Sequence, residues 1–295
     1  MTFLLGHLSD PHLGPLPRPR LRELVGKRLS GYINWQRGRH RIHDMDMLER
    51  LTEDLLQQKP DHIALTGDLV NIGLESEFVT AQLYLQRLGE APFVSVIPGN
   101  HDAYVRSSLQ YMAGALAPWM TGDGATLPRF PYVRIRDGIA LIGLSSGVPT
   151  APLLASGLLG EAQLAALAIV LREAGEAGLT RVVMIHHPPT LRGAARGRGL
   201  RDARAFESLI AKHGADLVIH GHNHRQSTLM LNGPDGPVPV VGVASASAIP
   251  GSPDHRAAYH LYRIERANGR ASISMQVRGL MENGLIGEGE SRILV

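Results

Sequence analysis

Ile97-Pro98-Gly99-Asn100-His101-Asp102 is the stretch that decides the fold. The apolar run before it, residues 93–97, is typical of a buried strand, and the Pro-Gly pair ends this strand sharply. Asn100 and His101 would then project from the carboxyl edge of a sheet, where open α/β sheets bind their ligands. An amide oxygen is a hard neutral ligand, and an imidazole can bind a metal or move a proton. The pair therefore suits a hydrolytic metal centre, and Asp102 could fix the loop that carries it.

Three further polar clusters follow apolar runs in the same way. They are Ser9-Asp10-Pro11-His12, then Thr66-Gly67-Asp68 with Asn71, and then the late histidines of His186-His187-Pro188-Pro189 and Gly221-His222-Asn223-His224. Carboxylates and imidazoles suit divalent transition metals. The chain has no cysteine, which excludes both a disulfide framework and a zinc–thiolate site. Any bound metal must therefore be held by oxygen and imidazole ligands.

The order of the apolar runs predicts an α/β fold. The expected strands 2–8, 62–66 and 93–97 alternate with helices at 48–56 and 78–88, and such alternation with short connections predicts a parallel sheet. Further on, we expect helices at 109–116, 161–173 and 203–213 and strands at 132–136, 139–144, 181–185 and 216–219. The runs 227–231, 238–243, 257–263 and 272–277, with turns at Pro234-Asp235-Gly236 and Asn268-Gly269, predict antiparallel strands of a second sheet. The 295 residues, 44% of them hydrophobic, suffice for one domain spanning 1–295.

Residues 15–42 differ in composition from the rest and indicate a basic insertion. Three prolines stiffen its start, and Glu23 alone opposes eight arginine and lysine side chains between residues 18 and 41. Leucines and Val25 within 21–29 would allow a short amphipathic helix. Two interpretations stay open: a solvated basic face, or a surface in which residues 18–41 contact an anionic lipid or nucleotide group. A second cationic segment, 192–201, alternates glycine with arginine and could either close over a phosphate or be a plain mobile loop.

The ordered clusters resemble the calcineurin-like metallophosphoesterase superfamily, whose pattern is D-x-H, G-D, G-N-H-[DE], a strand-end His and G-H-x-H. The match runs from Asp10 to His224. The resemblance implies a four-layer α-β-β-α sandwich, with two mixed sheets flanked by helices, and two divalent metal ions (Mn, Fe or Zn). It implies that Asp10, His12, Asp68 and His224 hold one metal and that Asp68, Asn100, His186 and His222 hold the other. His186 is preferred to its neighbour His187 because it directly follows the strand, although the reverse assignment stays open.

The resemblance also implies a reaction: in-line attack on phosphorus by a hydroxide held between the metals, with His101 as the general acid or as a charge stabiliser. Many relatives carry Asp where this chain has Asn71, so a charged partner for the catalytic histidine is in doubt.

Overall the motifs are similar to those of bacterial class III cyclic nucleotide phosphodiesterases, which implies a phosphodiester or nucleotide-type small molecule as substrate. Residues 26–35 look like an insertion in UDP-diacylglucosamine pyrophosphatases, and a UDP-2,3-diacylglucosamine-type pyrophosphatase acting on a membrane lipid precursor is therefore the alternative.

Other function classes are less favoured. A catalytically inactive scaffold would be expected to lack ligands, and none is missing. Aromatic residues, at 5%, are few for stacking on bases, so neither a nuclease nor stable nucleic-acid binding is expected. The run 143–147 matches the G-x-S-x-G motif around Ser145, but Pro149 and Pro152 oppose the helix that this motif requires. No apolar run is long enough for a signal peptide or a membrane span, so we expect a cytoplasmic protein, with peripheral contact at the inner membrane face if residues 18–41 bind lipid.

Overall fold

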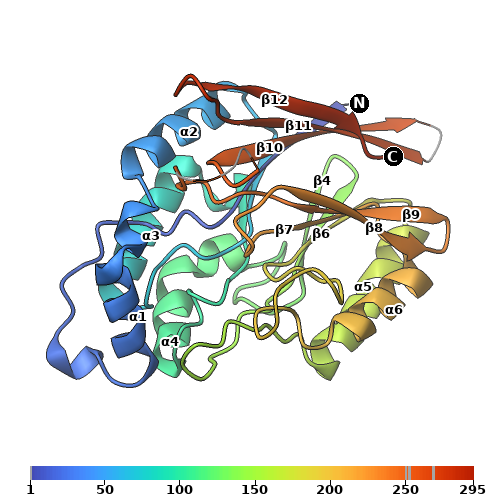
Figure 1. The fold of residues 1–295 in the computed structure, drawn as a ribbon. Coiled ribbons are helices and arrows are strands. Elements are labelled where there is room, and N and C mark those ends of the chain that lie inside the picture. Colours follow the sequence, from blue (N-terminus) through green and yellow to red (C-terminus); the bar gives the residue numbers. More distant parts are fainter. Residues whose placement is uncertain (1, 250, 252–253, 268–269) are drawn as a thin grey trace.

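The computed structural model describes residues 2–249, 251, 254–267 and 270–295. Two six-stranded sheets face each other in it (Figure 1). The first has the strand order β12-β11-β10-β1-β2-β3, and the second has the order β4-β5-β6-β7-β9-β8. Strands β1 to β3 are parallel to one another, as are β5, β6, β7 and β9, whereas the remaining strands pair antiparallel. Both sheets are therefore mixed, as the family resemblance implied.

The elements follow the apolar runs of the sequence closely. The strands are β1 (Thr2–Leu8), β2 (His62–Leu65), β3 (Val94–Val96), β4 (Tyr132–Arg136), β5 (Ile139–Gly143), β6 (Thr180–Met184), β7 (Leu217–His220), β8 (Ser227–Gly233), β9 (Gly236–Gly242), β10 (Ala258–Ala267), β11 (Arg270–Leu280) and β12 (Ile286–Ile293). The α-helices are α1 (Lys27–Arg37), α2 (Met45–Gln57), α3 (Glu75–Leu88), α4 (Arg106–Leu116), α5 (Glu161–Glu176) and α6 (Ala203–His213). Short 3-10 helices are η1 (Leu21–Glu23), η2 (Arg39–Arg41), η3 (Ala91–Phe93) and η4 (Ala117–Met120).

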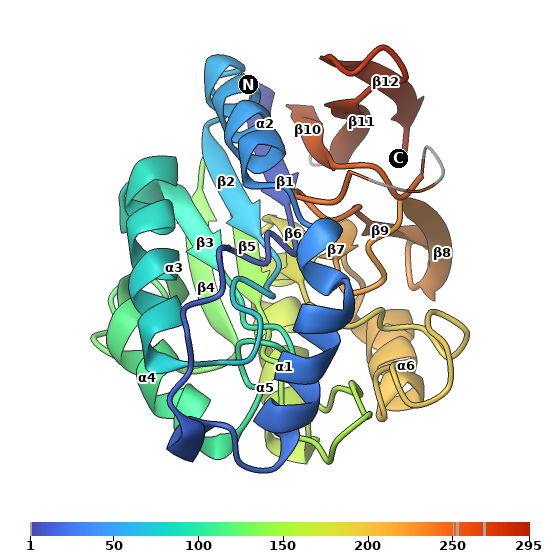
Figure 2. The ribbon, with the colours of Figure 1, turned by 60° about the vertical axis from the view of Figure 1, so that its left-hand side comes forward.

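Three apolar layers hold the fold together. Alternate residues of a strand point to opposite faces, so β6 sends Val182 and Met184 between the two sheets and Val183 toward α5 and α6. On the other side, Leu51 of α2 and Phe78 of α3 pack with the outer face of the first sheet. Figures 1 and 2 show the resulting order of layers, with α2, α3 and α4 beside the first sheet and α5 and α6 beside the second. Helices therefore cover the outer faces of both sheets.

Two predictions about the elements were wrong. The late strands do not form one antiparallel sheet: β8 and β9 join the second sheet, where β9 runs parallel to β7, while β10 and β11 join the first sheet beside β1. The helix expected within 21–29 is instead a short 3-10 turn followed, after Gly26, by α1. Strand β12 was not predicted at all. The expected turn at Asn268-Gly269 lies outside the described residues.

The sheet topology brings the polar clusters to one edge. Strands β1, β2, β3, β6 and β7 run parallel within their own sheets, and each delivers one predicted cluster just beyond its carboxyl end. Between β3 and α4 the chain forms the Asn100 loop, and the His186 loop follows β6. Among the described helices, none has both the length and the apolar character needed to cross a membrane.

Candidate metal centre

The backbone at the predicted ligands is unusual. Five of them have positive φ angles: Asp10 (52°), His12 (42°), Asp68 (55°), His222 (69°) and His224 (50°). Side chains other than glycine rarely adopt this conformation, and it persists at functional sites where the surroundings impose it. In an extended backbone, alternation would place His222 and His224 on the same side, but both residues are left-handed, so the backbone is not extended here. They nevertheless reach the same cluster.

One group of donors gathers around His224. Its Nε2 lies 3.1 Å from Nε2 of His12 and 3.3 Å from Oδ1 of Asp10. The Asp68 Oδ2 lies 3.9 Å from the His12 Nε2. The structure also brings in His43, whose ring centroid is 4.5 Å from that of His12 and whose Nδ1 lies 2.8 Å from the Ser247 hydroxyl. Sequence analysis missed His43 because no recognisable motif surrounds it.

A second group of donors gathers around His186. Its Nε2 lies 3.3 Å from Oδ2 of Asp68, 3.2 Å from Oδ1 of Asn100 and 3.3 Å from Nδ1 of His222. The same Asp68 oxygen faces the first group, so this carboxylate lies between the two groups. All seven residues predicted as ligands are therefore brought together, in two groups that share Asp68.

The donor atoms are better suited to bind metal ions than to form hydrogen bonds with one another. The Asp10 Oδ1 and the His222 Nε2 are buried without a hydrogen-bond partner, which is costly for an isolated protein group. Burial strongly lowers the pKa of His12 and of His222, which leaves them in the neutral form that binds metals. Burial also opposes charge on His186, but the Asp68 carboxylate outweighs it and raises the pKa of His186 to about 9. Asp68 thus favours a positive charge at this position, which a metal ion would supply.

The adjacent histidines differ in their hydrogen bonds. Both ring nitrogens of His187 are engaged, Nδ1 with the Ser146 hydroxyl at 2.8 Å and Nε2 with the Ala155 carbonyl at 3.1 Å. His186 donates from Nδ1 to the Thr66 carbonyl, and its Nε2 is left facing Asp68. A backbone carbonyl that fixes one ring nitrogen orients the other toward a metal. These bonds favour His186 as the ligand.

His101 lies beside the two groups and is oriented by the backbone. Its Nδ1 donates to the carbonyl of Asn71, and its ring stacks on Tyr104 with centroids 5.4 Å apart. The Asn71 side chain instead donates to the Leu13 carbonyl at 2.8 Å. The partner of His101 is therefore the main chain of Asn71, so its orientation needs no charged side chain. Burial, followed by the Arg39 charge, lowers the pKa of His101 to about 3, so the ring is neutral near pH 7 with Nε2 unprotonated.

Asp102 fixes the loop, as predicted. Its buried carboxylate accepts hydrogen bonds from the backbone N–H groups of Asp68 (2.8 Å), Leu69 (2.9 Å), Val70 (3.2 Å) and Gly99 (2.8 Å). The loops after β2 and β3 are thereby joined. Gly67, with a φ of 93°, packs so closely on Gly99 that a side chain at Gly67 would collide with this backbone.

A cavity of about 540 Å³ opens onto both donor groups. Asp68, Asn100, His222 and His224 line it, and the basic insertion supplies the cations Lys27, Arg37 and Arg39 to its wall. The insertion is therefore neither a wholly solvated face nor remote from the chemistry. Sequence analysis grouped these cations by composition alone and missed Tyr104.

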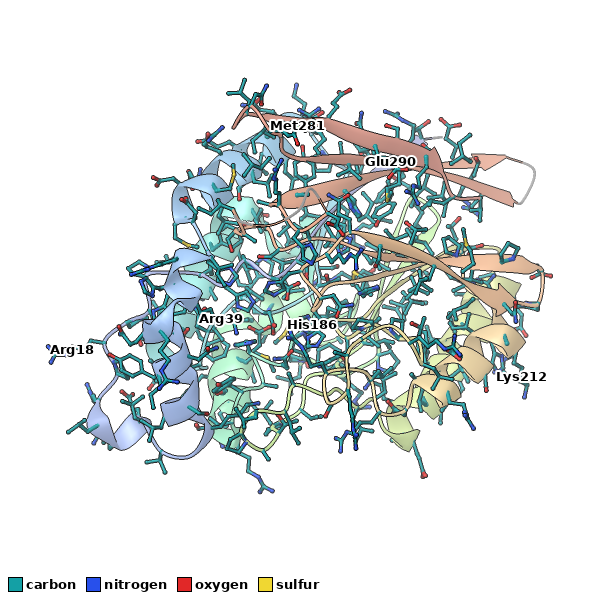
Figure 3. All side chains as sticks on the ribbon, in the orientation of Figure 1. Arg18, Arg39, His186, Lys212, Met281 and Glu290 are labelled. Atoms are coloured by element: carbon teal, nitrogen blue, oxygen red, sulfur yellow. The ribbon has the colours of Figure 1, made fainter. Side chains whose placement is uncertain are left out.

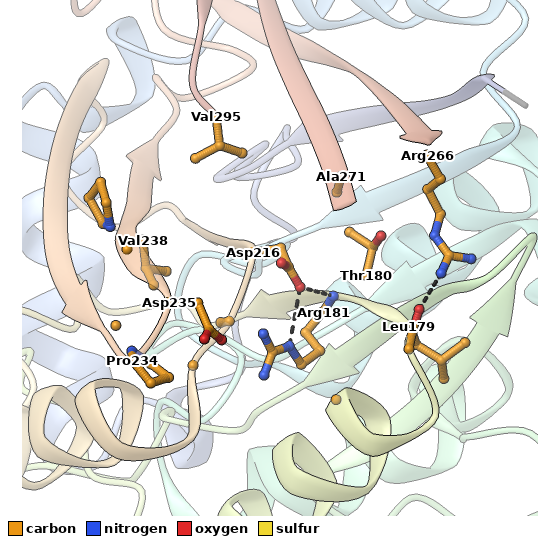
Figure 4. Close-up of a pocket in the computed structure, with 17 residues that line it drawn as sticks. Leu179, Thr180, Arg181, Asp216, Pro234, Asp235, Val238, Arg266, Ala271 and Val295 are labelled. Atoms are coloured by element: carbon orange, nitrogen blue, oxygen red, sulfur yellow. Dashed lines mark hydrogen bonds and ion pairs between the residues drawn. The ribbon is translucent and has the colours of Figure 1, made fainter. Parts of the chain in front are cut away.

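Another cavity, of about 520 Å³, lies where β6 and β7 begin, at the edge opposite to the ligand loops. Figure 4 shows three of its charged side chains engaged: Arg181 pairs with Asp216, at 3.2 Å, and Arg266 donates to a backbone carbonyl, that of Gly178. Within the described residues, the candidate metal-binding groups all lie at the ligand edge, so this cavity is not the metal centre.

Comparison with known proteins identifies the family of this chain. The family model described as calcineurin-like phosphoesterase matches residues 3–226. The chain belongs to this family. A relative in Synechococcus sp., named a probable cyclic nucleotide phosphodiesterase, is 32% identical over 228 residues, which cover 76% of this chain and 74% of that protein. The glycerophosphodiester phosphodiesterase GpdQ of Enterobacter lignolyticus is 28% identical over 232 residues, 75% of this chain and 71% of that protein.

A solved structure supports the fold. A dimetal phosphatase from Danio rerio superposes with a TM-score of 0.65 at 15% identity, covering 99% of this chain and 98% of that one. The α/β architecture of two mixed sheets flanked by helices is thus that of calcineurin-like phosphoesterases. This calcineurin-like phosphoesterase is a metal-dependent phosphoric ester hydrolase, as its family and named relatives indicate.

Proposed function

We propose that this protein hydrolyses a phosphodiester at a binuclear metal centre held by Asp10, His12, Asp68, Asn100, His186, His222 and His224. The observation that carries the proposal is the convergence of these side chains, with Asp68 between two donor groups and with orphaned donor atoms in both. Two divalent ions (Mn, Fe or Zn) would supply a bound hydroxide and neutralise charge on the phosphoryl oxygens. The diesterase names of the two relatives favour a small phosphodiester or nucleotide as substrate.

His101 would act at the leaving oxygen. Because its Nδ1 donates to the Asn71 carbonyl, its Nε2 is the atom available to the substrate. The neutral ring must first gain a proton to act as an acid, and a bound anionic substrate favours that gain by offsetting the Arg39 charge. The stacked Tyr104 ring keeps the imidazole in place.

Hydrolysis of bis(p-nitrophenyl) phosphate with Mn²⁺ tests this function. We expect metal-dependent turnover in the wild type and none in Asp68→Ala, because loss of the shared carboxylate leaves two dications that repel each other. Asp235→Ala, which removes an exposed carboxylate on the β8–β9 turn, is the matched control and should keep full activity. Wild-type rates in Asp68→Ala would refute the binuclear proposal.

One observation favours the lipid-precursor alternative. Exposed apolar side chains lie at the cavity and on the insertion that forms its wall: Leu153 (94% exposed) and Leu154 line the cavity, while Val25 (71%) lies just before α1 and Leu29 in its first turn. Exposed apolar groups beside cations suit a lipid at a membrane surface. On this alternative the protein would be a pyrophosphatase of the UDP-2,3-diacylglucosamine type, cytoplasmic and peripheral at the inner membrane face.

Liposome binding tests the alternative. Val25→Ser with Leu29→Ser should weaken binding to anionic vesicles severalfold, because the pair loses its exposed apolar surface. Hydrolysis of the small diester should be kept, since neither residue lines the cavity. Unchanged vesicle binding would remove the support for a lipid substrate.

We also propose that residues 1–295 form a single domain in which the insertion at about 15–42 is a wall of the active site.

A further inference from the structure

The basic insertion is followed by a buried histidine that the family pattern does not include. His43 lies between η2 and α2 and is 7% exposed. Figure 3 shows Arg39, which precedes it in η2, in the middle of the molecule with His186, whereas Arg18 of the same insertion extends from the periphery. The end of the insertion therefore reaches the ligand loops and places His43 beside them.

The loop after β9 fixes the backbone at His43. His43 pairs with this loop in an antiparallel bridge, and the N–H of the next residue, Asp44, donates to the Ser247 carbonyl at 2.8 Å. In the same loop, the Ser245 hydroxyl donates to the carbonyl of Asp10 at 2.6 Å. One loop thus positions both His43 and a predicted metal ligand, so their separation is set by the fold.

The His43 ring lies against two predicted ligands of the first donor group. Its centroid is 4.5 Å from that of His12 and 5.7 Å from that of His224. One possible ligand atom of each of these three histidines lies within 4.8 Å of the other two. The His43 Nδ1 lies 2.8 Å from the Ser247 hydroxyl, and among the described residues no hydrogen bond engages its Nε2. A protein group that holds one ring nitrogen leaves the other to bind a metal.

Two other histidines beside the donor groups differ from His43 in this respect. His187 lies close to His186 and His222, but hydrogen bonds engage both of its ring nitrogens. His101 keeps a free Nε2, but it lines the cavity, where that atom can contact the substrate. His43 is not among the described residues that line the cavity. Its free nitrogen is therefore placed to contact a bound metal and not the substrate.

A neighbouring cation gives the first donor group a need for a further ligand. The Arg39 Nη2 lies 3.1 Å from the Nε2 of His12, so the guanidinium would repel a dication held by that nitrogen. A third imidazole would offset this repulsion by adding a bond to the metal. Imidazole also suits Zn, Fe and Co better than it suits Mn.

Resting on the proposed binuclear centre, we infer that His43 is a further metal ligand, which binds through Nε2 the ion assigned to Asp10, His12, Asp68 and His224. Three imidazoles then hold this ion, and two hold the other. The ion beside His43 is therefore the more nitrogen-rich of the two in its ligands, and it has the stronger preference for Zn²⁺ or Co²⁺ over Mn²⁺.

Calorimetric titration of the metal-free protein with Co²⁺ measures the two affinities without turnover. His43→Phe keeps a flat ring without a donor atom, and His43→Gln keeps a polar group that can bond to Ser247. In both variants we expect one Co²⁺ affinity to fall roughly tenfold or more and the other to stay within about twofold. His40→Gln, which removes an exposed histidine of the same segment that belongs to none of the candidate metal-binding groups, is the matched control.

Proton NMR of the Co²⁺-loaded protein distinguishes a ligand from a residue that only supports the ligands. Co²⁺ shifts the N–H proton of each imidazole bound to it far from the other protons, so both His43 variants should lose one such exchangeable signal. His40→Gln should keep them all. An unchanged set of shifted signals, unchanged affinities, or loss of both ions together with a lower melting temperature of the metal-free variants would each overturn the inference. A wild type that binds two ions without hydrolysing the diester would refute the proposed function alone, and the binding and NMR results would still decide the role of His43.

Discussion

Removing the Asp102 carboxylate should strongly destabilise the protein. Asp102→Ala would leave four buried N–H groups without an acceptor, of which three now make bonds of 2.8–2.9 Å. An unsatisfied buried donor costs about 1–3 kcal/mol. Allowing for partial relaxation and water entry, we expect the free energy of unfolding to fall by roughly 3–6 kcal/mol, a large share of the ~5–15 kcal/mol that is usual for a domain.

Urea denaturation of the metal-free protein, followed by tryptophan fluorescence, measures this effect. Trp35 and Trp119 are both buried and should report unfolding. Asp102→Asn keeps one acceptor oxygen and should lose about half as much as Asp102→Ala. Asp235→Ala is the exposed control. If Asp102→Ala unfolds within about 1 kcal/mol of the wild type, the carboxylate does not join the two loops as argued.

Two further predictions concern histidines. His101→Ala should keep its metal content while kcat falls roughly 10²-fold, because His101 would act on the leaving oxygen in the transition state; loss of metal would make it a ligand instead. A leaving group of low pKa should partly restore the variant if the role is that of an acid. His62 is buried away from the cavity, and burial lowers its pKa to about 3. As the pH falls below about 6.5, His62 therefore becomes protonated in the unfolded chain while it stays neutral in the folded protein. Stability of the metal-free protein should therefore decline between pH 6 and pH 4, and His62→Gln should reduce this slope by about 1 kcal/mol per pH unit; an unchanged slope would contradict the argument.

The sequence predicted which polar side chains gather at one edge of the sheets because its signals are local. A strand that ends in proline or glycine and a polar cluster directly after it are both visible within about ten residues. Helix α6 has the predicted bounds, since its periodicity and its terminal Gly214 are equally local. The positions of Asp68 and Asn100 follow from these signals at the ends of strands. Their hydrogen bonds to neighbouring loops do not, because those partners come from distant parts of the chain.

Strand pairing could not be predicted for the same reason. Strand β10 pairs with β1, so that Phe3 lies opposite Ile264, and nothing in the alternation of β10 specifies that partner. Strand β12 escaped notice because most of its side chains are exposed at the sheet edge, which removes the apolar alternation. The role of the insertion was misjudged for another reason: composition gives the number of its cationic side chains but not where each side chain points. Hence Arg28, which is buried against backbone carbonyls, could not be distinguished from Arg41, which is exposed.

Because protein contacts hold the proposed ligand residues in strained conformations, we predict that the fold forms the proposed metal centre before any ion binds. A left-handed conformation at a residue other than glycine costs of order 1 kcal/mol or more, and five ligands adopt it. Contacts between loops impose it: the Asp10 N–H donates to the Gly67 carbonyl at 2.9 Å, the His12 N–H to the Asp68 carbonyl at 3.1 Å, and the His222 N–H to the Asp10 carboxylate at 3.0 Å. These bonds link the loops after β1, β2 and β7 without any metal. Chelation should therefore remove activity while leaving amide protons in these loops protected from exchange, whereas rapid exchange on chelation would show that the ions themselves order the site.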